Sequence, residues 1–433
     1  MKPSTPKTLF LTLILLQLVF WTLIPTLTRL SLPIDAIEGY VWGQHFDWGY
    51  DRNPWVNALL THWAVNLGGK SGWLVYGFSQ IFVCLGYFSV WKLAQKIFRS
   101  DTYALVSVLM LVGVQYTSLA AVDFNDNVIE LGLWPLFAYL SYEAFFSIKK
   151  SQELFYWILT GLIAGLALMT KYYSIMPIAS LGLFLLSTPD ARAKFKTLGP
   201  YLAGLLCFLI CLPHLLWLPK HHFMTMAYAL GKADQIARPL WARTHPILFF
   251  LWNHTYYALH FAWAQSLTFA GALALLGFAA FPRKPSAKAL PEVSLSPLAL
   301  KFLDFMVLGP FALTLLTSII FGWKLNTMWG TPLLSLWPIW VLGLLKPKFT
   351  SQGIWRIALA ALIVFVLLIT GYAIHNIRNQ GSRHNLNGQA ISDKINRQME
   401  SNYHSPITVI TGDRYLAGYI AFYADHPIKV KLY

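Results

Sequence analysis

Residues 8–55 read TLFLTLILLQLVFWTLIPTLTRLSLPIDAIEGYVWGQHFDWGYDRNPW, a long apolar run followed by a loop crowded with acids, a base and aromatic rings. An apolar run of about twenty residues crosses a bilayer as a single helix. We therefore expect a membrane span over 8–28 and a polar loop after it. An uncompensated charge near a membrane has an unfavourable free energy. We therefore expect the carboxylates of this loop either to pair with cations or to take part in the function.

The rest of the 433-residue chain is also apolar, with 56% hydrophobic and 12% charged residues and a mean hydropathy of +0.52. This composition predicts an all-α polytopic membrane protein, a bundle of about eleven transmembrane helices. The expected spans are 8–28, 72–91, 102–121, 128–147, 154–170, 173–187, 198–218, 262–281, 301–321, 330–345 and 355–374.

The basic residues give the chain a formal charge of +15, which by itself would suit nucleic acid. They occur instead in short groups between apolar runs, as the positive-inside rule describes, so we expect membrane lipids and no nucleic acid as partners. The groups assigned to the cytoplasm are Lys2 and Lys7; Lys92, Lys96 and Arg99; Lys149 and Lys150; Arg192, Lys194 and Lys196; Arg283, Lys284 and Lys288; and Lys346, Lys348 and Arg356. The N-terminus is then cytoplasmic, while the acidic loop and the C-terminus are extracytoplasmic.

The tail differs from the rest of the chain. Residues 376–433 are polar at first and end in ITVITGDRYLAGYIAFYADHPIKVKLY. The β-branched run at 407–410, a helix capped by Asp413 and a second strand at 429–433 predict a small extracytoplasmic α/β appendage. We therefore expect a transmembrane catalytic domain over 1–375 and a separate tail over 376–433.

The acidic loop offers the first candidate site residues. Asp35 and Glu38 are three residues apart, which places both carboxylates on one side of a helix. Either one is a candidate general base, and the alternative is a solvated carboxylate that pairs with Arg52. Asn53 is expected to cap a helix that has Pro54 in its first turn. This helix carries tryptophans, which suits the membrane interface. Its free amides beside Arg52 favour a phosphate, and a plain interfacial anchor is the alternative.

A second polar cluster, AVDFNDNVIELGLWP at 121–135, returns to the same side of the membrane. Asp123 or Asn125 is expected to cap the next helix. Asp126 and Asn127 remain as functional candidates. With the acidic loop they either share a divalent metal or divide the roles of base and substrate anchor. The sequence leaves this choice open.

A long extracytoplasmic loop over 219–244 contributes further cations, among them Lys220 and His222. A gate for a lipid phosphate is one option for these residues, and ordinary loop charges beside anionic head groups are the interpretation that the sequence favours. Adjacent histidines at 221 and 222 point to different sides of a helix, which makes them a poor chelate for a metal.

Four stretches resemble the membrane glycosyltransferases of the GT-C superfamily. They are GLIAGLALMTKYYS at 161–174, DAIEGYVWGQHFDWGYDRNPW at 35–55, FNDNVIELGLWPLFAYL at 124–140 and LPHLLWL at 212–218. The loop is similar to that of the bacterial branch related to protein O-mannosyltransferases and to the aminoarabinose transferase of lipid A. The resemblance covers most of the chain.

The resemblance assigns roles to particular residues. It implies that Asp35 is the catalytic base, that Asp51 is the second loop acid, and that Lys171, followed by Tyr172, lies near the donor phosphate. Asp126 and Asn127 match the second acidic turn of the family. The Glu usual after the first Asp is Ala36 here, and the usual His-Pro-Pro pattern is replaced by residues 52–55.

The implied activity is transfer of a sugar from a polyprenyl phosphate to an acceptor hydroxyl, with inversion at the anomeric carbon. The acceptor is expected to be a surface glycolipid, lipopolysaccharide or protein at the outer face of a bacterial inner membrane. No cofactor beyond a divalent metal is suggested. The alternatives are a transporter or flippase of lipid-linked sugars and a glycan ligase or polymerase. The clustering of charges at the ends of spans, away from mid-membrane, favours surface chemistry.

Overall fold

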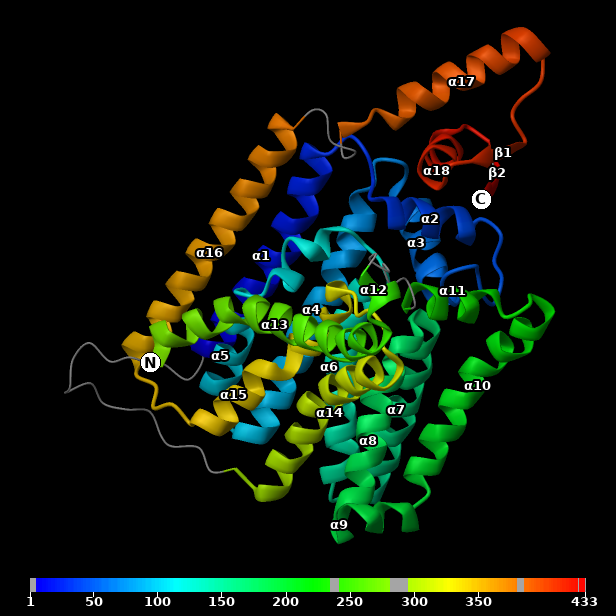
Figure 1. The fold of residues 1–433 in the computed structure, drawn as a ribbon. Helices are drawn as coiled ribbons and strands as arrows, with labels where there is room; N and C mark the ends of the chain where they lie inside the picture. Colours follow the sequence, from blue (N-terminus) through cyan, green and yellow to red (C-terminus); the bar gives the residue numbers. More distant parts are fainter. Residues whose placement is uncertain (1–4, 234–240, 281–294, 380–384, 427, 433) are drawn as a thin grey trace.

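The computed structural model describes residues 5–233, 241–280, 295–379, 385–426 and 428–432 (Figure 1). Nearly all of this is helix. The α-helices are α1 (Thr5–Thr28), α2 (Ile34–Gly43), α3 (Trp55–Gly68), α4 (Trp73–Phe98), α5 (Asp101–Leu111), α6 (Asp126–Phe146), α7 (Lys150–Thr170), α8 (Ile175–Ser187), α9 (Pro189–Arg192), α10 (Gly199–Lys220), α11 (Met224–Ala233), α12 (Trp241–Thr244), α13 (Pro246–Ala280), α14 (Pro297–Phe321), α15 (Trp337–Leu345), α16 (Ser351–Arg378), α17 (Gly388–Tyr403) and α18 (Arg414–Tyr423). The short 3-10 helices are η1 (Gln115–Thr117), η2 (Ala120–Val122), η3 (Tyr172–Ser174), η4 (Ala193–Lys196), η5 (Thr327–Gly330) and η6 (Leu333–Leu336), and the strands are β1 (Val409–Gly412) and β2 (Lys429–Leu432).

The predicted all-α membrane bundle is confirmed. In the described part of the chain, eight helices are long and apolar enough to cross a membrane, or ten if two bent pairs each count as one span. Helix α6 lies at an expected span but is not among them. The expected number of about eleven spans therefore stays a prediction.

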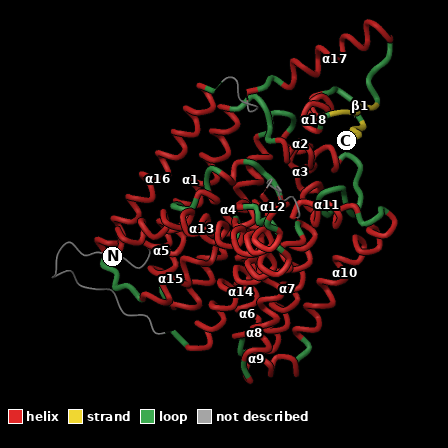
Figure 2. Tube along the Cα trace, in the orientation of Figure 1, coloured by secondary structure: helices red, strands yellow, loops and turns green. Residues whose placement is uncertain are grey.

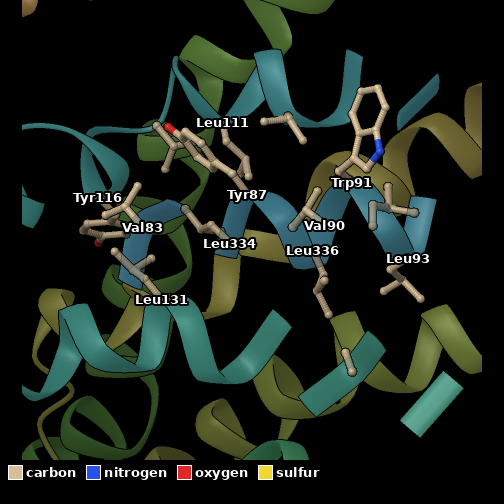
Figure 3. Packing of buried hydrophobic residues seen from close by; sticks show 14 of the residues in the cluster. Val83, Tyr87, Val90, Trp91, Leu93, Leu111, Tyr116, Leu131, Leu334 and Leu336 are labelled. Atoms are coloured by element: carbon tan, nitrogen blue, oxygen red, sulfur yellow. The ribbon is translucent and has the colours of Figure 1, made fainter. Parts of the chain in front are cut away.

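The core of the bundle forms where α4 crosses α6. A Cβ on Gly86 would lie 2.4 Å from the carbonyl oxygen of Leu131, and one on Gly132 would lie 2.8 Å from that of Phe82. Glycine at both positions lets the two helix backbones approach closely, as small residues do in membrane bundles. Figure 3 shows the buried side chains around this crossing, including Val83 and Tyr87 of α4.

One expected span is broken. Helix α5 and the segment Gln115–Val122 meet at an angle of 87°. At the break, Gly113 contacts the backbone of Gly271 in α13, where a Cβ would lie 2.6 Å from a carbonyl atom. The bend leads the chain through η2 directly into the second polar cluster, so it delivers that cluster to the start of α6.

The tail forms the expected strand, helix and strand. β1 and β2, coloured yellow in Figure 2, pair in parallel, with Val409 opposite Lys429. Asp413 caps α18 by accepting hydrogen bonds from two backbone amides. The sequence did not predict helix α17 or the docking of α18 on α2. Tyr419 donates a hydrogen bond to the carbonyl of Leu32 at 2.7 Å, just before α2 begins. The tail thus packs against the helix that carries Asp35 and Glu38.

Candidate active site

Helix α2 places the first two carboxylates. It begins after Pro33, which suits a helix start because proline needs no amide partner there. Asp35 lies in its first turn and is half-buried, while Glu38 is buried at 6% exposure. The predicted spacing of three residues on one helix is confirmed.

A tight turn brings Arg52 to this helix. The turn is closed by a bridge between Gly49 and Pro54 and by a hydrogen bond from Tyr50 N to Asn53 O at 3.0 Å. Arg52 Nε lies 3.6 Å from Glu38 Oε1 and 3.6 Å from Asp51 Oδ2. The expectation that Asn53 caps the following helix is wrong, because α3 begins after Pro54 without a side-chain cap.

The second polar cluster arrives at the start of α6. Asn125 caps this helix by accepting from the amides of Asn127 and Val128, and its Nδ2 donates to Asp35 Oδ2 at 3.4 Å. Lys171 forms a salt bridge with Asp126 Oδ2 at 2.9 Å and donates to Asn127 Oδ1. The loop and the cluster, about ninety residues apart in sequence, therefore meet through Asp35 and Asn125.

These groups line one cavity of about 400 Å³. Its polar lining includes Asp35, Glu38, Arg52, Asn53, Asn57, Asp126, Asn127, Lys171, Tyr172, Tyr173, Tyr228, Lys232, Thr314, Thr317 and Asn326. Trp323, Trp329 and several aliphatic side chains complete the wall. A concave site that combines apolar walls with convergent polar groups is typical of a ligand pocket.

The charged side chains of this cavity differ in the kind of group that they contact. Arg52 is paired with Glu38, and Lys171 is paired with Asp126, whereas Asp35 accepts a hydrogen bond from the neutral amide of Asn125. Burial, together with the negative charges of Asp126 and Asp123, raises the pKa of Asp35 to about 6. Burial also raises the pKa of Glu38, against the opposing effect of Arg52. A carboxyl with a pKa near neutrality suits a general base.

A further ion pair, in which Arg29 is buried and Asp123 is half-exposed, lies at the second polar cluster. Arg29, at the end of α1, donates to Asp123 at 2.7 Å and to the hydroxyl of Tyr372 in α16 at 3.2 Å. The sequence reasoning missed this contact. Its signal was present, since Arg29 is a charge directly after an apolar span and needs a partner.

The remaining candidates lie in different places. Asp51 does not line the cavity but contacts Arg52 from the adjacent position. Tyr172 lines the cavity, and its hydroxyl lies 2.5 Å from Nε2 of His214. Lys220 and His222 are exposed at the end of α10 and are not among the lining residues. The structure therefore brings seven of the ten candidates together in the cavity wall.

A divalent metal finds few ligands here. The ammonium group of Lys171 already lies 2.9 Å from the Asp126 carboxylate. Among the residues that the structure describes, no group of three or more His, Cys, Asp or Glu side chains is placed to hold a metal ion. The carboxylates that line the cavity are those of Asp35, Glu38 and Asp126.

Comparison with known proteins gives a family match for part of the chain and a similar fold for nearly all of it. Residues 52–217 match the family model of dolichyl-phosphate-mannose-protein mannosyltransferases. The fold is similar to the crystal structure of ArnT from Cupriavidus metallidurans bound to undecaprenyl phosphate, with a TM-score of 0.64 and 14% identity over 99% of this chain and 86% of that one. The apo form of ArnT gives a TM-score of 0.56 and 15% identity over 98% and 85% of the two chains. No curated protein sequence matches the chain significantly.

The chain is a polytopic membrane protein whose fold is similar to that of ArnT, and residues 52–217 match a family of mannosyltransferases. The resemblance noted in the sequence is thereby confirmed.

Proposed function

We propose that the protein transfers a sugar from a polyprenyl-phosphate donor to an acceptor hydroxyl at the extracytoplasmic face of the membrane. The observation that carries this proposal is the cavity wall, where three carboxylates meet two cations that are paired with carboxylates, Arg52 and Lys171. The undecaprenyl phosphate bound to the similar ArnT supports a lipid-phosphate donor.

Asp35 is the proposed base. Its carboxylate accepts the proton of the acceptor hydroxyl as the acceptor oxygen bonds to the anomeric carbon. The bond between that carbon and the phosphate oxygen breaks in the same displacement, so the configuration inverts. The amide of Asn125, which donates to Oδ2 of Asp35, orients the carboxylate for this step.

Lys171 and Arg52 are proposed to hold the donor phosphate. As the sugar leaves, the phosphate gains negative charge, and cations already fixed in position stabilise it in the transition state. Both cations are held by carboxylates before the ligand arrives, at 2.9 Å for Lys171 and at 3.6 Å for Arg52. Asp126, Asn127, Glu38 and Asp51 then act as anchors for these cations.

The proposed orientation follows from the distribution of charge. The basic groups at the ends of α4, α8 and α15 lie at one end of their spans, and the candidate site is built at the other end. The positive-inside rule puts the basic end in the cytoplasm. We therefore place the site and the C-terminal tail outside the inner membrane of a bacterium, with a glycolipid, lipopolysaccharide or protein as acceptor.

Transport of a lipid-linked sugar without chemistry is the alternative. A transporter holds its charges at mid-membrane, in discontinuous helices of two matching halves. Here the candidates of the cavity wall lie in the short helix α2, in the turn before α3, at the start of α6 and directly after the end of α7. That location favours transfer at the surface. A ligase or polymerase would also act there, and it differs in the donor, a pyrophosphate in place of a monophosphate.

Mass spectrometry of surface glycans tests the proposal. Cells that express the protein are compared with cells that lack it and with cells that express Asp35→Asn. The expected result is a glycan one sugar heavier only with the wild-type protein. Identical glycan masses in all three strains, together with unchanged glycoproteins, would rule out the transferase.

A further inference from the structure

The turn that carries Arg52 is held by two buried side chains from α10 and α11. His214 Nδ1 lies 2.7 Å from the carbonyl oxygen of Trp48, and Thr225 Oγ1 donates to the carbonyl of Tyr50. His214 and Thr225 both have 0% exposure. These two carbonyls flank Gly49, where a Cβ would lie 2.7 Å from His214 Nδ1, so the turn sits directly against the imidazole.

The hydrogen bonds define the state of His214. A carbonyl oxygen only accepts, so Nδ1 of His214 carries the hydrogen that is donated to Trp48. In the neutral ring, Nε2 is then an acceptor, and the hydroxyl of Tyr172 donates to it at 2.5 Å. The histidine uses both ring nitrogens, each toward a different segment of the chain.

Those two segments carry the paired cations of the cavity. Tyr172 directly follows Lys171, and Arg52 lies two residues beyond Tyr50. From α11, the ring of Tyr228 packs 5.2 Å from the Arg52 guanidinium and completes the support of this side chain. A single imidazole therefore connects the Lys171 segment to the Arg52 turn across the wall of the cavity.

We infer that His214 is a positioning residue that sets the separation between Lys171 and Arg52, and that Thr225 holds the same turn from its other side. The inference rests on the proposed function, in which these two cations grip one phosphate. Fixed spacing matters because a displacement of about 1 Å can lower the rate about a hundredfold.

Binding of polyprenyl phosphate without a sugar tests the inference, because it requires no turnover. The purified full-length protein is titrated in lipid nanodiscs and compared with His214→Ala, His214→Asn, Tyr172→Phe and the pair Thr225→Val and Thr225→Ser. The exposed His375→Ala, on α16 and outside the cavity wall, is the matched histidine control.

His214→Ala is expected to weaken binding about tenfold, since both contacts are lost and a buried carbonyl is left without a donor. His214→Asn keeps a donor near the Nδ1 position, and Tyr172→Phe removes only the other contact, so each should weaken binding less. Thr225→Val should weaken it and Thr225→Ser should retain it. In turnover, His214→Asn should raise the KM for the donor more than it lowers kcat.

The outcomes distinguish a failure of the positioning role of His214 from a failure of the proposed donor. Binding that is unchanged in His214→Ala, or in both His214→Asn and Tyr172→Phe if the alanine variant fails to fold, would overturn the inference. Equal losses in Thr225→Val and Thr225→Ser would overturn the role of the Thr225 hydroxyl. If the wild-type protein itself does not bind polyprenyl phosphate, the proposed donor is wrong instead.

Discussion

The two ends of the helical bundle use ion pairs for different purposes. At the basic end, Lys96 pairs with Glu143 at 2.9 Å and Lys194 pairs with Glu153 at 3.0 Å. Each of these pairs joins two elements of the bundle, and neither lines the cavity. At the cavity end, Arg52 and Lys171 are also paired, yet both face a space large enough for a ligand.

The difference lies in what surrounds the pairs. At the basic end, one carboxylate meets one cation, and the contact serves packing. At the cavity end, Asp35 adds a further carboxylate that is bound by an amide, and its pKa is raised to about 6. An ion pair thus stabilises the fold at one end. At the other end, we propose, it holds a cation in position for the reaction.

The largest expected effect comes from Asp35→Asn. Loss of the base should lower the rate of sugar transfer about a thousandfold, within the range known for general bases. Because the ionised Asp35 carboxylate is disfavoured by burial, the neutral amide should not lower the free energy of unfolding at pH 7. Single-turnover kinetics and thermal unfolding of the purified variant measure the two effects. Transfer at the wild-type rate would remove Asp35 from the mechanism.

Lys171→Gln should have the next largest effect, a decrease of about a hundredfold in kcat/KM. It removes a cation from the proposed phosphate site and leaves the Asp126 carboxylate without its partner. The measurement is steady-state transfer with varied donor. Lys96→Gln is the control, since Lys96 also pairs with a carboxylate but at the opposite end of the bundle.

The rate of transfer should fall at low pH and stay constant at higher pH. The base acts only when ionised, and the pKa of Asp35 is about 6. Transfer should therefore fall about tenfold per pH unit below pH 6 and level off above it. The profile of kcat/KM measured between pH 4.5 and 8 checks this. A flat profile over that range would contradict the assignment.

The smallest effect is expected at the basic end. Lys96→Gln should lower the free energy of unfolding by about 1 kcal/mol, because half of the lysine side chain is exposed and water screens the pair. The transfer rate should stay within about twofold of wild type. Chemical denaturation and the transfer assay together test whether the two ends are as distinct as proposed. A large loss of transfer in this variant would contradict the proposed difference between the basic end and the cavity end.

Local patterns in the sequence predicted much of this architecture. Apolar length located the helices, the spacing of Asp35 and Glu38 predicted their shared helix, and Asp413 was a correct cap. These features depend on neighbours within a few residues. The bend at Gly113 was missed because hydropathy does not register a change of direction.

Contacts between distant segments were not predictable in the same way. The bond between Asn125 and Asp35 joins residues 90 positions apart, and that between His214 and Trp48 joins residues 166 apart. Asn125 was expected only as a cap, and it serves as the cap and contacts Asp35 as well. A histidine inside the apolar stretch LPHLLWL was a visible sign of the contact that His214 makes, since buried polar groups need partners.

Native mass spectrometry with polyprenyl phosphate tests the central claim most directly, namely that the cations of this cavity hold a single lipid phosphate. The wild-type protein and Lys96→Gln should each retain one lipid phosphate, and Lys171→Gln should lose it. Equal retention by Lys171→Gln and the wild-type protein would contradict the account.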